Sequence, residues 1–139
     1  MDFKEYREKF YTDPEPEPRY AFTGLAGYSI FVRDYDSALA YYTEVLGPPA
    51  YVEGASTHGW RIGDAWFTLF PARNEGPKRS EITIMMDSIE EAERLHADFI
   101  AAGGSGEPPS DELMYEPIRF CAVKDPFGTD LLIIARRAE

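Results

Sequence analysis

The side chains that most often carry chemistry in proteins are scarce in this sequence. Its histidines are His58 and His96, and Cys121 is its single cysteine. One cysteine allows neither an intrachain disulfide nor a zinc cluster built on cysteines. Cys121 falls in a run typical of a strand, where we expect an inert small hydrophobic residue. His96 lies at the edge of a helical apolar stripe and indicates packing, whereas His58 begins a predicted strand and could reach the mouth of a cavity.

Two carboxylates, Glu81 and Asp130, are the other candidates for chemistry. Glu81 starts a predicted strand and is expected to face the concave side of the sheet. It could act as a ligand-binding anion, or as a general base whose pKa is raised by burial. Alternatively it is a half-exposed surface carboxylate beside Lys78 and Arg79. A remodelled metal site of His58, Glu81 and Asp130 is conceivable, but clusters without a motif rarely prove to be sites.

The composition argues against two classes of partner. The 139 residues include 14 Lys+Arg and 25 Asp+Glu, which gives a formal net charge of −11. Nucleic acids and anionic membranes are bound through basic surfaces, so we expect neither as a partner. The N-terminal residues are charged, and no stretch approaches the roughly 18 apolar residues of a membrane span. We therefore expect a soluble cytoplasmic protein.

Residues 1–23 differ in character from the rest of the chain. Phe3, Tyr6 and Phe10 recur at the spacing of one helix face. A helix this short is marginal alone, so we expect it to dock on the body of the protein or on a partner subunit. The alternating prolines that follow favour an extended tether. We therefore divide the chain into a helix and tether at 1–23 and a core domain at 24–136.

The core domain shows a similar order of elements twice. Its first half predicts a strand at 27–33, a helix at 35–46, and short strands near 50–53, 58–62 and 65–71. Its second half predicts a strand at 81–86, a helix at 88–102, and strands near 117–124 and 129–136. The last strand is almost wholly apolar, which is typical of a central, buried strand.

The two halves are related by a shift of 54 residues. This shift places Ile30 on Ile84 and Val45 on Phe99, so that the apolar pattern matches through strand and helix. A lone module would leave one face of its sheet exposed, so two must pair to close a core. The economical interpretation is two βαβββ modules, at about 24–72 and 79–136.

Two segments resemble a known family. The run from Phe31 to Gly47, FVRDYDSALAYYTEVLG, is similar to the first-module signature of the vicinal oxygen chelate superfamily. That group includes glyoxalase I, extradiol dioxygenases, fosfomycin-resistance enzymes and bleomycin-resistance proteins. The segment from Lys124 to Leu132 is similar to the hairpin that leads into the family's last strand. The resemblance implies an α+β fold, in which two βαβββ modules form one curled mixed sheet around a concave cavity with the helices outside.

The resemblance also locates the positions at which the family's enzymes hold a divalent metal. These positions correspond to Gly27, to Phe67 or Thr68 depending on register, to Glu81 and to Leu132. Glu81 is the one usual metal ligand among them. Metal catalysis normally needs about two or three protein ligands and an open site. We therefore expect neither a metal nor another cofactor.

The concave face is the predicted site for a small molecule. The chain has 9 Tyr, 9 Phe and 2 Trp, and aromatic walls with a few polar groups can hold planar or cationic ligands. The candidate ligand-binding residues are Ser29, Phe31, Trp60, Trp66, Thr68, Glu81, Thr83, Met85, Tyr115 and Asp130. Alternatively, the aromatic side chains fill the curled sheet and leave no cavity.

The segment 108–117 is predicted as a polar loop with two apolar residues, Met114 and Tyr115. These residues could form a flap over the cavity or a patch at a dimer interface. They could equally anchor the loop by being buried.

Three functions remain open from the sequence. The missing metal ligands, the aromatic residues and the negative charge favour a metal-free homodimer that sequesters a small aromatic or cationic molecule, similar to the bleomycin-resistance branch. The second possibility is a metal-dependent lyase or dioxygenase with altered ligands. The third is an accessory protein that acts through its surfaces, with the N-terminal helix and tether as its interaction element.

Overall fold

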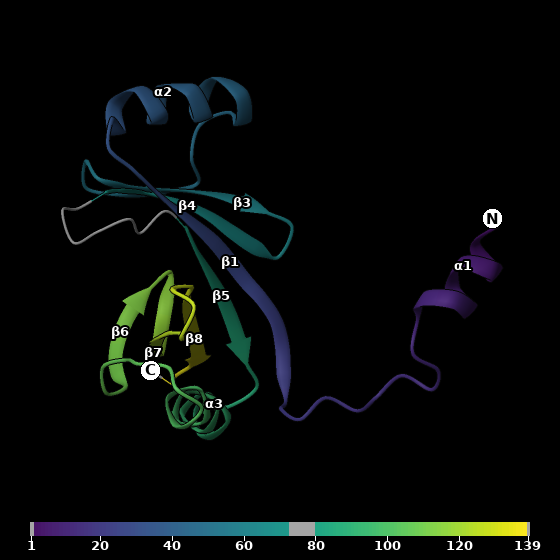
Figure 1. The fold of residues 1–139 in the computed structure, drawn as a ribbon. Helices are drawn as coiled ribbons and strands as arrows, with labels where there is room; N and C mark the ends of the chain where they lie inside the picture. The colour runs from purple at the N-terminus through teal and green to yellow at the C-terminus, as the bar shows by residue number, and fades with distance from the viewer. Residues whose placement is uncertain (1, 73–79, 139) are drawn as a thin grey trace.

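The structure is a computed structural model, and it describes residues 2–72 and 80–138. Figure 1 shows the elements in chain order. They are α1 (Phe3–Phe10), β1 (Phe22–Val32), α2 (Tyr35–Leu46), β2 (Tyr51–Glu53), β3 (Thr57–Ile62), β4 (Ala65–Pro71), β5 (Ser80–Met86), α3 (Ile89–Ala101), β6 (Ser110–Met114), β7 (Glu116–Lys124) and β8 (Asp130–Arg136).

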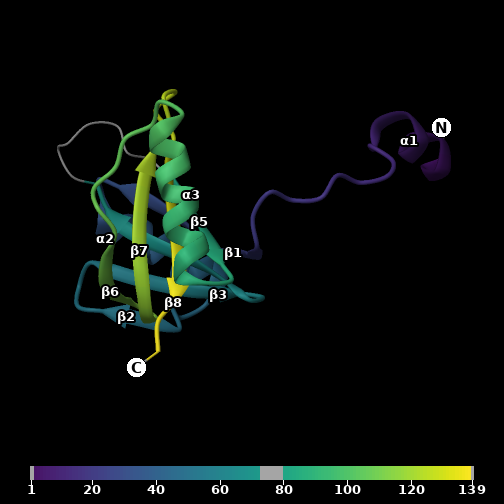
Figure 2. The same ribbon diagram turned by 90° about the horizontal axis from the view of Figure 1, so that it is seen from below.

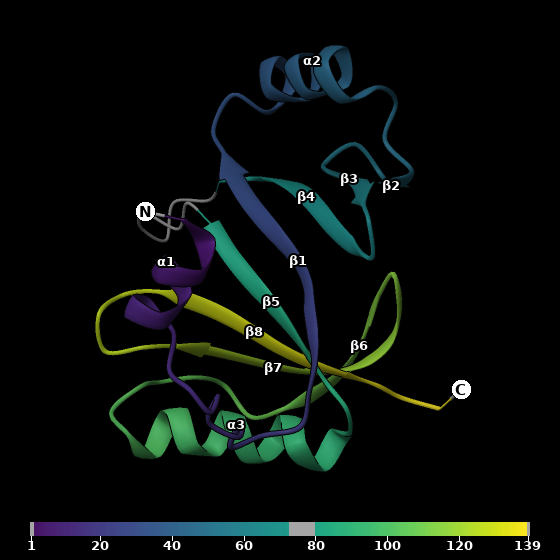
Figure 3. The ribbon, with the colours of Figure 1, turned by 90° about the vertical axis from the view of Figure 1, so that its right-hand side faces the viewer.

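The strands form one curled mixed sheet in the order β2–β3–β4–β1–β5–β8–β7–β6. β1 is parallel to β4, and β5 is parallel to β8, so each module builds one half of the sheet. The two halves join where β1 and β5 pair in antiparallel fashion. The helices α2 and α3 lie outside the curl, over opposite ends of the sheet (Figures 1 and 3). The predicted α+β fold of two βαβββ modules is confirmed.

The second module holds most of the tightly packed core. Ser88 caps α3 by accepting a hydrogen bond from the backbone N–H of Glu91, at 3.1 Å. The apolar stripe of α3 then packs on the outer face of β5, β7 and β8, where the buried residues are Met86, Ala92, Leu95, Cys121, Val123, Ile133 and Ala135. Burial raises the pKa of the Cys121 thiol to about 11, which agrees with an inert packing residue.

The first module is packed more loosely. α2 begins at its N-cap Asp34, whose side chain accepts a hydrogen bond from the N–H of Ser37, and it ends at Gly47 with a φ of 91°. None of its residues is buried, and Tyr41 and Val45 are 60% and 61% exposed. By contrast α3 buries Ala92, Leu95 and His96. Because helices are stabilised mainly by packing of an apolar face, α2 is the less firmly held of the two.

Two strands depart from the prediction by more than a single residue at an end. β1 begins at Phe22 rather than at residue 27, and its pairing with β5 shifts register between Phe22 and Gly24 and again between Leu25 and Gly27. These irregularities disturb the two-residue alternation by which a strand is recognised. The other difference is β6, which occupies Ser110–Met114, inside the segment predicted as a loop. Charged residues are typical of edge strands, and in β6 they give the sequence the polar character of a loop.

α1 and its tether lie away from the sheet (Figures 1 and 2). The helix buries no residue, and Phe3 and Phe10 are 67% and 61% exposed. The expected docking of this helix on the body of the protein is therefore not what the structure shows. In the part of the chain that the structure describes, no helix is long and apolar enough to cross a membrane.

Candidate functional site: the concave cavity

The concave side of the sheet encloses a cavity with a volume of about 1690 Å³. Residues of β1, β4, β5 and β8 line its floor, and those of β5 and β8 alternate along the strand, since successive side chains of a strand point to opposite faces. Strand pairing sets one row of residues side by side across four strands, namely Gly59, Thr68, Ser29 and Glu81. The aromatic side chains therefore do not fill the curl completely.

Most of the predicted site residues do line this cavity. They are Ser29, Phe31, Trp66, Thr68, Glu81, Thr83, Met85, Tyr115 and Asp130. Glu81 is only 9% exposed, so it is not the half-exposed surface carboxylate of the alternative interpretation. Lys78 and Arg79, its suggested neighbours, lie outside the described residues. Asp130 forms an ion pair with Lys124 at 3.3 Å.

The placement of Trp60 on the concave face is wrong. Trp60 lies on the helix side of the sheet, where its ring is 6.1 Å from the rings of Tyr42 and Phe67. Its indole N–H donates to the carbonyl of Gly47 at 2.8 Å, which ties the end of α2 to the sheet. The alternation along β3 instead gives Gly59 and Arg61 to the cavity side. The large side chains of β3 pack on the helix side of the sheet. The number of aromatic residues in the sequence does not indicate which face of the sheet they occupy.

His58 is also on the helix side and does not reach the cavity mouth. Its ring lies 2.7 Å, Nδ1 to Oη, from the hydroxyl of Tyr35, which donates to the carbonyl oxygen of Leu69 at 2.9 Å. Burial raises the pKa of Tyr35 to about 12. The suggested metal site of His58, Glu81 and Asp130 is therefore wrong, because His58 faces away from the two carboxylates.

The positions that the resemblance assigns to a metal carry few donor groups. Strand pairing places Thr68 beside Ser29 and Leu132 beside Thr83. Phe67 packs against Tyr42 on the helix side, so Thr68 rather than Phe67 is the position that faces the cavity. Gly27, Thr68, Glu81 and Leu132 offer one carboxylate and one neutral hydroxyl, a donor set that does not fit a divalent metal. Within residues 2–72 and 80–138, no group of three or more His, Cys, Asp or Glu could hold a metal ion.

The backbone around Gly27 leaves no room for a side chain. A Cβ added there would lie 2.3 Å from the backbone oxygen of Trp66 on the neighbouring strand. Any side chain at this position, including a metal-binding one, therefore requires β1 and β4 to move apart. The close approach of β1 and β4 therefore favours glycine at this position.

Aromatic residues gather at the end of the cavity formed by β2, β3 and β4. The rings of Trp66 and Tyr115 are stacked, with centroids 4.2 Å apart and planes 6° apart. The ring of Tyr51 meets Tyr115 edge-on at 4.4 Å, and the guanidinium of Arg61 lies 4.3 Å from the Trp66 ring. The Tyr115 hydroxyl is hydrogen-bonded to the hydroxyl of Thr68. Tyr51 and Arg61 are not among the residues predicted from the sequence, because only the register of β2 and β3 places them on the cavity side.

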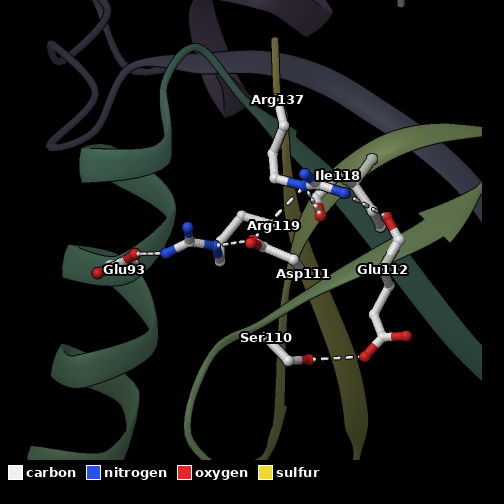
Figure 4. Close-up of polar contacts among 7 residues, drawn as sticks. All are labelled: Glu93, Ser110, Asp111, Glu112, Ile118, Arg119 and Arg137. Carbon is white, nitrogen blue, oxygen red and sulfur yellow. Dashed lines mark hydrogen bonds and ion pairs between the residues drawn. The ribbon is translucent and has the colours of Figure 1, made fainter. Parts of the chain in front are cut away.

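β6 and the turn after it carry Tyr115 over the cavity from the second module. Polar contacts on the outside of the sheet fasten this edge strand (Figure 4). Arg119 donates to Asp111 at 2.7 Å and also to Glu93 of α3, and Arg137 donates to the carbonyl of Ile118 at 2.9 Å. The segment around Tyr115 is thus an edge strand with a turn that covers the cavity, rather than a free flap.

Comparison with known proteins agrees with this architecture. A family model for the Glyoxalase/Bleomycin resistance protein/Dioxygenase superfamily matches residues 24–133. The chain belongs to this superfamily, whose members include the vicinal oxygen chelate proteins. No curated protein matches the chain.

Solved structures with the same fold include enzymes of different activity. The chain is similar to the Mn(II)-bound glyoxalase from Novosphingobium aromaticivorans, at 20% identity and a TM-score of 0.65, with 86% of this chain and 42% of that one covered. It is similar to methylmalonyl-CoA epimerase from Mycobacterium tuberculosis at 15% identity and a TM-score of 0.63, with 88% of this chain and 94% of that one covered. It is also similar to the H200C variant of homoprotocatechuate 2,3-dioxygenase from B. fuscum at 17% identity and a TM-score of 0.67, with 88% of this chain and 36% of that one covered. At these identities the likeness shows the fold alone.

Proposed function

We propose that this member of the superfamily binds a small aromatic or cationic molecule in its concave cavity without a metal. The observation that carries the proposal is the chemistry at the four metal positions, where one carboxylate stands among Gly27, Thr68 and Leu132. A metal-activated reaction needs more donors than this set provides. What remains is a deep cavity with aromatic walls and hydroxyl groups, a surface suited to holding a ligand.

The charge of the cavity and of the whole chain favours a cationic ligand over an anionic one. Among the described residues, six carboxylates and three basic side chains line the cavity: Glu53, Asp64, Glu81, Glu112, Glu116 and Asp130 against Arg61, Lys124 and Arg136. The net charge of −11 adds an attractive field for cations at long range. Aromatic faces also attract cations through their quadrupole, and more strongly where water is excluded.

Isothermal titration against a panel of planar aromatic cations that includes proflavine tests the proposal, with an anionic planar dye as the control ligand. We expect saturable binding of at least one cation, about tenfold weaker after Phe31→Ala because an aromatic face of the cavity wall is lost. Phe127→Ala is the matched control, since Phe127 is 90% exposed and does not line the cavity. Absence of binding across the panel would contradict the proposal.

Metal analysis of the purified protein separates this proposal from a metal-dependent lyase or dioxygenase. We expect no stoichiometric transition metal after dialysis. Stoichiometric Ni, Zn, Fe or Mn that disappears in Glu81→Gln would instead establish an altered metal site at this position. Glu81→Gln keeps the size of the side chain and removes its charge, so a loss of metal would report on ligation rather than on packing.

We further propose that the chain forms a homodimer in which α1 of one copy packs on α2 of the other. Both helices expose an apolar stripe, Phe3, Tyr6 and Phe10 on α1 and Tyr41 and Val45 on α2. Their charges are weakly complementary. The α1 helix has three basic and two acidic residues, a net charge of +1, whereas α2 has the two acidic residues Asp36 and Glu44 and no basic one. The extended tether holds α1 away from its own body (Figure 2), which leaves its apolar stripe open to a second copy.

Light scattering coupled to size-exclusion chromatography tests the dimer. We expect the full chain to be dimeric at micromolar concentration. Removal of residues 2–12 and the double change Tyr41→Ser, Val45→Ser should each give a monomer, because each removes one side of the same contact. A monomeric full chain would contradict the proposal, and so would a dimer that survives both changes.

A further inference from the structure

The ring of Tyr115 fills a slot that belongs to the other module. The walls of the slot are the face of Trp66, at 4.2 Å, and the edge of Tyr51, at 4.4 Å. Its inner end is the hydroxyl of Thr68, a residue that is 4% exposed and is hydrogen-bonded to the Tyr115 hydroxyl. A phenol ring is therefore recognised on its face, on its edge and at its hydroxyl.

The depth of the slot depends on Gly59. A Cβ at this position would lie 2.6 Å from the hydroxyl oxygen of Tyr115 and 3.3 Å from its Cε1. Any other residue at 59 would therefore exclude the hydroxyl end of the ring. The backbone of Gly59 is paired beside Thr68, so the space above it leads directly to the hydrogen-bonding partner.

Tyr115 occupies this slot from a strained and exposed turn. Its φ is 65°, in the left-handed region that non-glycine residues adopt at an energetic cost. Leu113, two residues earlier, is 74% exposed, so little burial holds the outer side of this turn. Burial raises the pKa of the Tyr115 phenol, which keeps it neutral and able to donate a hydrogen bond. Strain in the turn favours release of the ring once another ring can take its place.

We propose that the slot between Trp66, Tyr51 and Gly59 is a binding site for a single aromatic ring with a hydroxyl group, and that Tyr115 is its internal occupant. The inference rests on the proposed function in that the ligand enters the same cavity, and it adds the chemical class of one part of that ligand. A 4-hydroxyphenyl group displaces Tyr115, stacks on Trp66 and bonds to Thr68. Tyr115 thereby selects for ligands that reproduce its own contacts.

Tyr115→Gly opens the slot and also relieves the strain, because glycine tolerates a φ of 65°. The probe is 4-methylphenol, which has the shape of the deleted side chain, and tryptophan fluorescence reports its binding. We expect saturable binding to this variant, at least about tenfold tighter than to the wild-type chain, whose slot is occupied. Toluene, which lacks the hydroxyl, should bind about tenfold more weakly than 4-methylphenol.

The matched control is Gly59→Ala combined with Tyr115→Gly. This variant has the same open turn but a methyl group where the hydroxyl end must lie, so binding of 4-methylphenol should be lost. Equal binding to both variants would overturn the proposal, as would equal affinity for toluene and 4-methylphenol. Absence of saturable binding to a folded Tyr115→Gly protein, as judged by circular dichroism, would overturn it too.

A measurement on the wild-type chain covers the case in which Tyr115→Gly does not fold. With 4-methylphenol at tens of millimolar, the NMR signals of the Tyr115 ring should move towards those of a solvent-exposed tyrosine. Signals that stay constant while other sites respond would contradict displacement. The titration with planar cations is independent of this experiment, so either proposal can fail while the other stands.

Discussion

His58 and His96 are both buried, but the hydrogen bonding around their rings differs. His58 is 8% exposed and shares a hydrogen bond with Tyr35. His96 is 5% exposed, and its Nε2 has no hydrogen-bond partner among the described residues. This nitrogen faces Gly106, where an added Cβ would lie 3.2 Å from it. A buried polar atom without a partner is destabilising, whereas a paired one is not.

We therefore expect opposite effects from the same substitution at these two sites. His96→Leu should raise the free energy of unfolding by about 1 kcal/mol, because an unpaired polar atom is replaced by an apolar group of similar size. His58→Leu should lower it by about 1 kcal/mol, because Tyr35 loses a partner. Urea unfolding followed by circular dichroism measures both values. Destabilisation by both changes would show that the Nε2 atom of His96 is satisfied in solution.

At the scale of single elements, β6 is held chiefly by polar contacts. It is the last strand of the sheet, and within residues 2–72 and 80–138 it pairs with β7 alone. Ser110, Asp111 and Glu112 all lie in this strand and take part in the cluster of Figure 4. Arg137 joins that cluster from beyond the end of β8, through the carbonyls of Ile118 and Glu112. The cluster therefore determines how firmly the turn with Tyr115 is positioned.

Arg137→Ala should loosen β6 without affecting the centre of the sheet. Loss of its hydrogen bonds to backbone carbonyls is worth about 1 kcal/mol, which corresponds to roughly fivefold faster amide exchange in 110–114. The neighbouring change Arg136→Ala is the control, since its ion pair with Glu116 is exposed and should contribute little. Hydrogen–deuterium exchange read by mass spectrometry measures the difference. Equal exchange in both variants would contradict a clamp at Arg137.

At the scale of the whole molecule, groups with raised pKa values are spread over both modules. Burial raises the pKa of Tyr35 to about 12 and that of Cys121 to about 11. The hydrogen bond to Glu53, together with burial, raises the pKa of Tyr51 to about 12. The protonated form of each group is favoured in the folded state. Its stabilising contribution is therefore complete below the unfolded pKa, which is 9.0 for the thiol and 10.0 for the phenols.

Stability should consequently fall as the pH rises from about 9 to 12. The unfolded chain releases these protons first, so each step of pH within this window favours unfolding. The midpoint of urea unfolding, measured by circular dichroism from pH 8 to 12, tests this. Tyr35→Phe removes one of the groups and should make the decline shallower. A midpoint that stays constant to pH 12 would contradict the prediction.

The elements and the family could be predicted because their signals are local. The two-residue alternation of 81–86, the helical stripe of 88–102 and the apolar run after Asp130 each reflect one strand or helix against one core. β6 was missed since an edge strand needs no apolar alternation, and its pairing with β7 is decided by the neighbouring strand. Trp60 was misplaced since large apolar side chains suit either face of a curled sheet.

The sequence by itself determined the two-module fold and the family. These properties depend on residue types and their spacing, both of which can be read along the chain. Only the tertiary structure decided that Thr68 rather than Phe67 faces the cavity and that His58 turns away from it. It also brought Tyr115 against Trp66, residues from different modules. Such contacts depend on strand register and on the curl of the sheet, which long-range packing sets.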